Sequence, residues 1–255
     1  MFVEERQREI LEFLHQNGKV LVKDLSERYQ VTPDLIRKDL AKLEKAGLLK
    51  RTYGGAIPLI QNSVPQPADD SHENNIEVKQ RIAEKAETLI RNGDTVFLDL
   101  SSINVEIARQ LVRKNRNVTI VTNMINVLEE IPGESRVKLI FIGGKMNKLR
   151  EGFTGAATIE WMSRFQFDLS FIGVVGIDFV RNSATTYEID DALTKTGAIK
   201  ISNKSYIVAE STKFNSTGNC RSASLNSFSG IITDAGLDPE IVEKLTQIGL
   251  QVLLV

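Results

Sequence analysis

Residues 31–56 read VTPDLIRKDLAKLEKAGLLKRTYGGA, and this stretch determines the fold of the first part of the chain. Thr32 is a favoured N-cap, Pro33 is favoured at the first helical position, and Asp34 complements the helix dipole. Apolar residues then recur at helical spacing, and Gly47 suits the position that follows a helix. The stretch therefore predicts one strongly capped helix that ends just before Gly47.

Two amphipathic segments precede this helix. Glu5–Asn17 and Val22–Tyr29 each place apolar residues on one face at helical spacing, and a short turn separates the second segment from the capped helix. Residues 48–55, which follow the capped helix, indicate a β-hairpin with cationic strand residues. Two short helices joined by a tight turn and followed by a hairpin form a winged helix-turn-helix pattern.

The capped helix has one apolar face and one basic face. At 100° per residue, Ile36, Leu40 and Leu43 share the face that packs inward. The major groove of DNA admits one helix, whose Arg and Lys side chains donate to guanine or to phosphates. A basic face that is merely solvated is the alternative, but here the cap, turn and hairpin accompany it. We therefore expect DNA contacts from the following residues: Thr32, Asp34, Arg37, Lys38, Lys42, Lys50, Arg51 and Tyr53.

The net charge of the whole chain hides an asymmetry between its parts. The formal charge is −1 over 255 residues, which alone would argue against nucleic acid as a partner. Residues 1–55 carry 11 Lys and Arg against 9 Asp and Glu, so +2, whereas the remainder carries 21 against 24, so −3. Residues 34–53 alone carry six basic and three acidic residues, so +3. The charge distribution is thus compatible with a DNA-binding first part.

Composition excludes several classes of protein. The hydrophobic content of 42% is that of a globular chain, and no apolar run approaches the roughly 20 residues of a membrane span. A single cysteine, Cys220, excludes a disulfide framework within the chain. The two histidines, His15 and His72, do not have the spacing of a zinc site. We expect a cytoplasmic protein with no metal, no cofactor and no membrane partner.

A polar stretch divides the chain. Three of the six prolines fall between residues 57 and 75, where no helical or strand period is present, so we interpret this stretch as a linker. The expected parts are a winged helix-turn-helix domain (1–56), the linker (57–75) and a second domain (76–255).

The second domain predicts an α/β fold. Helices are expected at Glu77–Asn92 and near Asn104–Val112, and Trp161 and Phe165, four apart on a further predicted helix, are expected in the core. The expected strands are Thr95–Leu100, Val118–Thr122, Val137–Ile142, Leu169–Val175, Tyr206–Ala209, Gly230–Thr233 and Val252–Val255. Apolar strands separated by helices indicate a mostly parallel sheet that is covered on both faces.

Polar and glycine residues follow the predicted strands. Ligands of such sheets bind at the carboxyl ends of the strands, and hydroxyl groups at the start of a helix suit a phosphate. Ordinary turn chemistry explains each residue taken alone, but their repetition at one sheet edge predicts a binding cleft. The candidate residues are Asp99, Ser101, Ser102, Asn104, Thr122, Asn123, Gly143, Gly144, Lys145 and Lys213.

Residues 6–56 resemble the winged helix of the DeoR family of bacterial sugar-metabolism regulators. The resemblance is carried by Arg8-Glu9-Ile10-Leu11, by Val22-Lys23-Asp24-Leu25 and by the whole run from Val31 to Ala56. The family's recognition helix usually reads S-x-x-T-I-R-R-D-L, whereas here Leu35 replaces the Thr and Lys38 the second Arg. The resemblance thus implies a mode of DNA binding and not an operator sequence.

Residues 76–234 resemble the DeoR-type sensor domain, whose fold is shared with ribose-5-phosphate isomerase and glucosamine-6-phosphate deaminase. Stretches that carry the resemblance include Gly93–Asp99, Thr119–Asn123 and Ala209–Phe214. The resemblance implies a phosphorylated sugar as effector, with the loop Ser101–Asn104 at the phosphate. The residues that it implies nearer the sugar are Asp99, Asn123, Glu188 and Lys213. Ile103 stands where the family has Thr, and Glu210 where Asp is usual.

Three functions are compatible with this sequence. The first is a transcriptional regulator, expected to be a repressor and a symmetric homo-oligomer (dimer or tetramer), that binds operator DNA under the control of a phosphorylated sugar. The second is a sugar-phosphate isomerase or deaminase that carries a DNA-binding head, although the sequence has no assembled nucleophile–base pair. The third is an adaptor without a ligand. The regulator is the prediction we carry forward.

Overall fold

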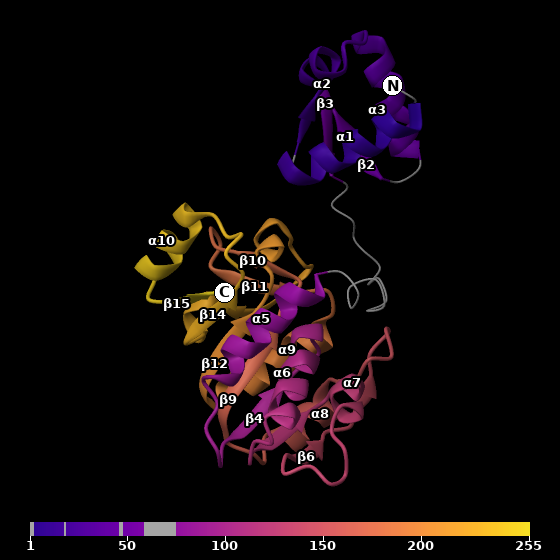
Figure 1. Cartoon of the computed structure of the whole chain (residues 1–255). Coiled ribbons are helices and arrows are strands. Elements are labelled where there is room, and N and C mark those ends of the chain that lie inside the picture. Colours follow the sequence, from indigo (N-terminus) through magenta and orange to yellow (C-terminus); the bar gives the residue numbers. More distant parts are fainter. Residues whose placement is uncertain (1–2, 18, 46–47, 59–74) are drawn as a thin grey trace. The chain divides into compact units, whose positions relative to one another are not determined.

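The computed structural model describes residues 3–17, 19–45, 48–58 and 75–255, which fall into two units, Met1–Val64 and Pro65–Val255. Most of the expected linker, residues 59–74, lies outside the described residues, as does Gly47. Each unit has its own helices and strands (Figure 1).

The first unit is a winged helix-turn-helix. Its elements are α1 (Val3–Asn17), β1 (Val20–Leu21), α2 (Val22–Tyr29), α3 (Pro33–Lys45), β2 (Leu49–Thr52) and β3 (Gly55–Pro58). The three predicted helices and the hairpin are confirmed. The sequence did not predict β1, which has only two residues and pairs antiparallel with β3. The sheet order is β1-β3-β2.

Local chemistry fixes the turn between α2 and α3. Gln30 ends α2 in the left-handed conformation with φ 52°, and the Thr32 hydroxyl accepts a hydrogen bond from the Leu35 N–H at 3.4 Å, as its N-cap role predicts. The apolar face of α3 packs inward as predicted, with Ile36, Leu40 and Leu43 all buried. The basic face of α3 is therefore left to solvent.

The second unit is built on a seven-stranded parallel sheet in the order β15-β14-β12-β9-β4-β5-β6. All seven predicted strands belong to this sheet: β4 (Thr95–Leu98), β5 (Thr119–Thr122), β6 (Lys138–Phe141), β9 (Phe167–Gly173), β12 (Ser202–Val208), β14 (Gly230–Thr233) and β15 (Gln251–Leu254). The helices are α5 (Ile76–Glu87), α6 (Ser102–Arg113), α7 (Ile125–Glu129), α8 (Ala156–Met162), α9 (Ile189–Lys200) and α10 (Pro239–Gln247), with 3₁₀ turns η1 (Ser211–Asn215) and η2 (Leu225–Ser227). The α/β fold is thus confirmed.

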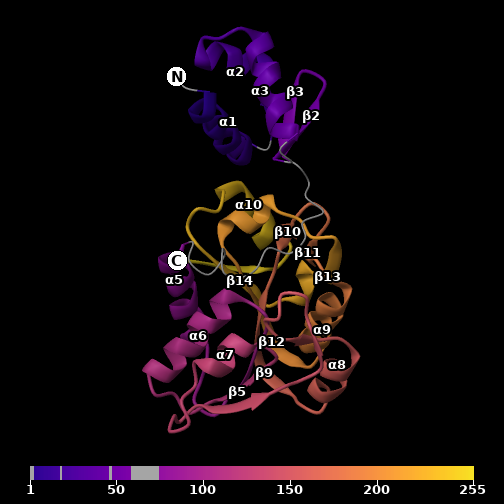
Figure 2. The ribbon, with the colours of Figure 1, turned by 90° about the vertical axis from the view of Figure 1, so that its right-hand side faces the viewer.

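Helices cover both faces of this sheet. Figure 2 shows α5, α6 and α7 on one side and α8 and α9 on the other. Alternate residues of β4 serve the two faces, because Val96 and Leu98 pack with the helices α5 and α6 while Phe97 packs in the opposite layer. Phe97 is fully buried and stacks on Phe167 at 5.1 Å between ring centroids. Two apolar cores, one on each face, therefore hold the sheet.

Smaller elements complete the unit and were not predicted. β10 (Gly176–Asp178), β11 (Ser183–Thr186) and β13 (Cys220–Ser224) form an antiparallel sheet, and β7 (Lys145–Met146) pairs with β8 (Phe153–Thr154). Strands β10, β11 and β13 consist mostly of small or polar residues, and β7 and β8 have two residues each, so none of them shows the apolar pattern on which sequence prediction depends. Within the described ranges, no helix is both long enough and apolar enough to cross a membrane.

The expectation that Trp161 lies in the core is wrong. Trp161 is 61% exposed, whereas its neighbour Met162 is buried. Helix α8 ends at Met162, so Phe165 lies outside it and the helical four-residue spacing does not apply. Phe165 is only partly buried and stacks on Phe167.

Candidate functional site

The topology of the parallel sheet creates a cavity. From the central pair β4 and β9, strands β5 and β6 extend in one direction and β12, β14 and β15 in the other. The loops that follow β4 and β9 therefore lead to opposite sides, and ligands of such sheets bind in the crevice between them. A cavity of about 220 Å³ lies at this point, and residues 100–103 after β4 and 173–175 after β9 line it.

The start of α6 forms one wall of the cavity. Ser101 is the N-cap of α6, and its hydroxyl accepts a hydrogen bond from the Ile103 N–H at 3.3 Å. A Cβ atom at Gly173 would lie 2.4 Å from the Ser101 Cβ, so glycine at this position lets β9 approach α6 closely. Ser102 also lines the cavity, beside the positive end of the helix dipole.

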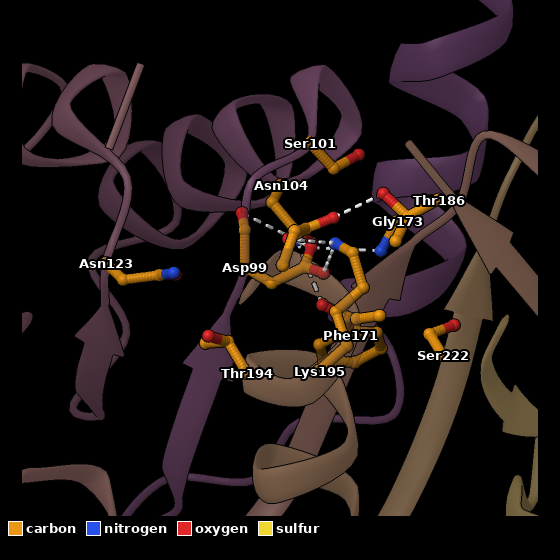
Figure 3. Close-up of polar contacts among 12 residues, drawn as sticks. Asp99, Ser101, Asn104, Asn123, Phe171, Gly173, Thr186, Thr194, Lys195 and Ser222 are labelled. Carbon is orange, nitrogen blue, oxygen red and sulfur yellow. Dashed lines mark hydrogen bonds and ion pairs between the residues drawn. The ribbon is translucent and has the colours of Figure 1, made fainter. Parts of the chain in front are cut away.

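A buried ion-pair cluster lies beneath this wall (Figure 3). The Lys195 ammonium contacts Asp99 Oδ2 at 2.5 Å and Asp191 Oδ1 at 3.3 Å. Asp99 Oδ1 accepts hydrogen bonds from Asn104 Nδ2 at 2.7 Å and from the Gly173 N–H at 2.9 Å. Asp191 also accepts a hydrogen bond from the Thr186 hydroxyl. The cluster thus ties together β4, α6, β9, β11 and α9 around the cavity.

Burial and charge act in opposite directions on this cluster. Burial raises the pKa of the Asp99 carboxyl, while the charge of Lys195 and the donors to Asp99 oppose that effect. For Lys195, burial acts to lower the pKa, but the charges of Asp191 and Asp99 outweigh it, and the pKa is raised. Lys195 therefore keeps its positive charge at the cavity wall.

A second group of charges lines the side of the cavity next to α5. Lys79, on α5, is only 3% exposed, and Glu210 and Lys213 come from the segment that follows β12. Burial lowers the pKa of Lys79, Glu210 acts to raise it, and Lys213 acts to lower it further. The side-chain amide of Asn75 donates to Glu210 Oε2 at 2.8 Å. Two cations and one carboxylate therefore share this wall.

A hairpin contributes the third side of the cavity. Asn147, Leu149 and Glu151 lie between β7 and β8 and line the cavity. The Asn147 carbonyl oxygen Oδ1 accepts a hydrogen bond from the Glu151 N–H at 2.9 Å, and the Ile125 N–H donates to the Glu151 carbonyl at 2.8 Å. These contacts fix the hairpin against the start of α7.

Four of the candidate residues line the cavity: Ser101, Ser102, Glu188 and Lys213. The structure places the other predicted residues elsewhere. Asp99, Asn104, Thr122 and Asn123 are buried behind the wall, and Gly143, Gly144 and Lys145 lie outside the lining. Lys145 forms an exposed ion pair with Asp190 at 2.8 Å, and the hydrogen bond to Asp190 together with its negative charge raises the pKa of Lys145. Asn104 binds the protein itself, since its amide donates to Asp99 and to the Phe171 carbonyl.

Sequence reasoning missed five charged or amide residues of the lining: Lys79, Asn147, Glu151, Asp191 and Lys195. Lys79 could have been found, because it precedes Ile82 and Ala83 by three and four residues on the inward face of α5. A lysine among the apolar residues of a buried helix face indicates a site where its charge has a use. Asn147 and Glu151 lie in the loop between β7 and β8, where no period exists, and Asp191 and Lys195 lie on α9, whose approach to Asp99 depends on the tertiary fold.

The candidate DNA-binding residues lie on the exposed side of the first unit. Thr32, Asp34, Arg37, Lys38 and Lys42 are exposed on or beside α3, and Lys50, Arg51 and Tyr53 are exposed on the wing. Arg37 is held by Asp34 at 2.5 Å on the same helix. Behind this face, Asp39 of α3 is buried and pairs with Arg6 of α1 at 2.7 Å. Among the described residues, no group of three or more His, Cys, Asp or Glu could hold a metal ion.

Two sequence models of known protein families match separate parts of the chain. The sequence model of the DeoR-like helix-turn-helix domain matches residues 6–61, and that of the DeoR C-terminal sensor domain matches residues 74–235. The chain is 34% identical to the "Putative aga operon transcriptional repressor" of Escherichia coli O157:H7, over 98% of this chain and 93% of the relative. It is 30% identical to the glycerol-3-phosphate regulon repressor of Escherichia coli strain K12, over 98% of each chain.

Solved structures are similar only in part. Ribose 5-phosphate isomerase A from Methanocaldococcus jannaschii matches 55% of each chain with a TM-score of 0.41 and 11% identity.

Proposed function

Because the chain belongs to the DeoR family of transcriptional regulators, we propose that it is a sequence-specific, DNA-binding repressor of a sugar-utilisation operon. A phosphorylated sugar in the cavity of the second unit controls its affinity for DNA. In this proposal, residues 1–56 bind the operator, residues 76–255 bind the effector, and residues 57–75 link these two domains. One observation carries the proposal. The same chain contains a helix with an exposed basic face, α3, and a polar cavity between the loops that follow β4 and β9.

The DNA-binding part of the proposal rests on α3 and the wing. Arg37, Lys38 and Lys42 are exposed on the recognition helix α3, and its apolar face is fully used in the core. Such side chains donate to guanine or to phosphates in a major groove, and the wing cations, Lys50 and Arg51, suit the adjacent backbone. Binding to a chromosomal operator implies that the protein works in the cytoplasm.

Titration of the purified protein against its selected operator tests this part. The operator comes from in vitro selection with random duplexes, and fluorescence anisotropy gives the affinity. If Lys38 and Arg37 contact bases, Lys38→Ala and Arg37→Ala should each weaken binding by about 5- to 150-fold. If they contact phosphates, each substitution should reduce the slope of log K against log salt concentration by about 1. Lys200→Ala, an exposed lysine of the second unit, is the matched control. Affinity that neither salt nor the two substitutions change would refute the proposal.

The effector part rests on the lining of the cavity. The start of α6 offers hydroxyl groups and a positive dipole end, and Lys79 and Lys213 add cations to the lining, so the cavity suits a phosphoryl group. Carboxylates on the other walls, including Glu188, suit sugar hydroxyls. A thermal-shift series with hexose, pentose and triose phosphates tests this part, since a ligand at 100 times its Kd stabilises by about 2.7 kcal/mol. A melting temperature that no phosphorylated sugar raises would contradict it.

We further propose a non-enzymatic, symmetric homo-oligomer. The relatives are named as regulators, and a two-fold assembly matches inverted half-sites. Light scattering coupled to size exclusion measures the assembly, and a monomer at operator-binding concentrations would be contrary to it. Turnover of pentose or hexosamine phosphates by the purified chain would favour the isomerase or deaminase alternative.

A further inference from the structure

Asn75 connects the cavity wall with the first turn of α5. Its side-chain amide donates to Glu210 Oε2 at 2.8 Å, across 135 residues of sequence. Its carbonyl accepts a hydrogen bond from the Lys79 N–H at 3.1 Å, and its own backbone is left-handed with φ 60°. Asn75 directly follows residues 59–74, which join the two units in sequence. Asn75 thus contacts Glu210, a lining residue of the cavity, and directly follows the connecting segment in the sequence.

Three charged side chains line this wall of the cavity. Lys79, Lys213 and Glu210 all line the cavity, and Lys79 is almost fully buried. A phosphoryl group brings a charge of about −1.5 to −2 and three strong acceptor oxygens. The charge of Glu210 acts to raise the pKa of Lys79, so the two side chains are electrostatically coupled. A phosphoryl group beside Lys79 and Lys213 would therefore lie near the Glu210 carboxylate, and like charges at close range repel.

We infer that Glu210 competes with the phosphoryl group of the effector for Lys79 and Lys213, and that its displacement breaks the bond to Asn75. The inference rests on the proposed function, because it takes a phosphorylated effector as the ligand of this cavity. It assigns Glu210 and Asn75 as positioning residues that pass the occupancy of the cavity to the start of α5.

The backbone around Glu210 is anchored, so its side chain is the part that moves. Asp234 accepts hydrogen bonds from the Ser211 N–H and from the Ser211 hydroxyl, both at 2.7 Å. The Lys213 N–H donates to the Glu210 carbonyl at 2.9 Å. The Glu210 side chain itself is partly exposed and can turn toward solvent. Displacement of Glu210 therefore acts on Asn75 without unfolding η1.

Two substitutions in the full-length protein test separately the competition between Glu210 and phosphate and the loss of the bond to Asn75. Asn75→Gly removes the amide and keeps a residue that adopts the left-handed conformation readily. Glu210→Gln removes the charge and keeps an oxygen that can accept from Asn75. Asn115→Gly is the matched control, because Asn115 is also left-handed (φ 50°) but does not line the cavity. The probe is inorganic phosphate, titrated by calorimetry at constant ionic strength, with amide hydrogen exchange of the peptide that covers residues 75–79.

Linkage predicts the outcome. If phosphate must break a bond between Glu210 and Asn75, then removal of that bond tightens phosphate binding by about two- to tenfold in Asn75→Gly. Glu210→Gln should tighten binding by at least about threefold, since the competing charge is gone. Phosphate should speed exchange at residues 75–79 in the wild type and in Asn115→Gly, whereas in Asn75→Gly exchange is already fast and does not respond.

Contrary outcomes are distinguishable. Phosphate that binds the wild type, with affinity unchanged or weakened in both Asn75→Gly and Glu210→Gln, overturns this inference and leaves the proposed function standing. A wild type that binds neither inorganic phosphate nor any phosphorylated sugar overturns both. A merely structural role of Asn75 would alter thermal stability without the gain in phosphate affinity, and so also counts against the inference.

Discussion

Replacing Asp39 by alanine would leave a charge inside the winged helix. Asp39 lies on the recognition helix α3 and is 2% exposed, and its partner Arg6 on α1 is 4% exposed. The Arg6 Nε donates to Asp39 Oδ2 at 2.7 Å, and Gln7 donates to Oδ1 at 2.9 Å. The Arg6 Nη2 has no hydrogen-bond partner among the described residues, so Asp39 is the chief compensation for its burial. Removal of one partner of a buried ion pair costs about 3–5 kcal/mol.

Hydrogen exchange of the full-length protein measures this loss. Peptides from α1 and α3 report the free energy of opening of the winged helix, and Asp39→Ala should lower it by about 3–5 kcal/mol. Asp34→Ala is the control, because its ion pair with Arg37 lies on the exposed face of the same helix and such pairs contribute about 0–1 kcal/mol. The double variant Arg6→Met with Asp39→Leu removes both charges and should recover most of the loss.

Two results would refute the reasoning. The first is a loss in Asp39→Ala no larger than in Asp34→Ala. The second is a loss that the double variant does not recover, which would mean that the buried charge of Arg6 is not the cause.

Three further predictions concern the second unit. Hydrogen bonds from Ser211 and Gly236 outweigh burial and lower the pKa of Asp234 below 3.8. Its stabilising contribution is therefore present above about pH 3.8 and lost as the pH falls through the lower, folded value. Urea unfolding at pH 7 and pH 3 should show a smaller acid-induced loss in Asp234→Asn, and an equal loss would disprove the assignment. Phe97→Ala should lower the free energy of unfolding by about 3–5 kcal/mol in urea at pH 7, because the ring is fully buried; a loss under about 1 kcal/mol would contradict its core position. Trp161, the sole tryptophan, should show red-shifted emission and ready quenching by acrylamide in the native protein, unlike a core residue.

The sequence predicted the elements that have a strong local signal. Thr32 and the apolar stripe of α3 determined that helix, because capping and helical periodicity are properties of a few neighbouring residues. The seven strands of the parallel sheet were predicted because each contains a short apolar run, and the five inner strands are largely buried on both faces. Strands β10, β11 and β13 pair through polar residues, so their existence depends on tertiary contacts and not on a local pattern.

The sequence indicated where the cavity lies better than it indicated which residues line it. A cavity lies at the expected sheet edge, at the carboxyl ends of β4 and β9. Strand-end position does not tell which side chains face the cavity, and Asp99 and Asn104 turn inward to bind each other. Lys79 and Lys195 reach the cavity from helices on opposite sides of the sheet, a convergence that only the folded chain creates.

The buried cluster around Lys195 also constrains how such a protein can diverge. Asp99 and Lys195 lie 96 residues apart. A change at Lys195 alone leaves two carboxylates without their shared cation, and a change at Asp99 alone leaves Lys195 with Asp191 as its remaining counter-charge among the described residues. In the descent of this chain, Lys195 must therefore be retained or altered together with its carboxylate partners. Leu149 and Glu188, which are partly exposed at the cavity, carry no such penalty. New effector preferences can thus evolve by single substitutions at the hairpin and at the start of α9, while the interior beneath them is inherited unchanged.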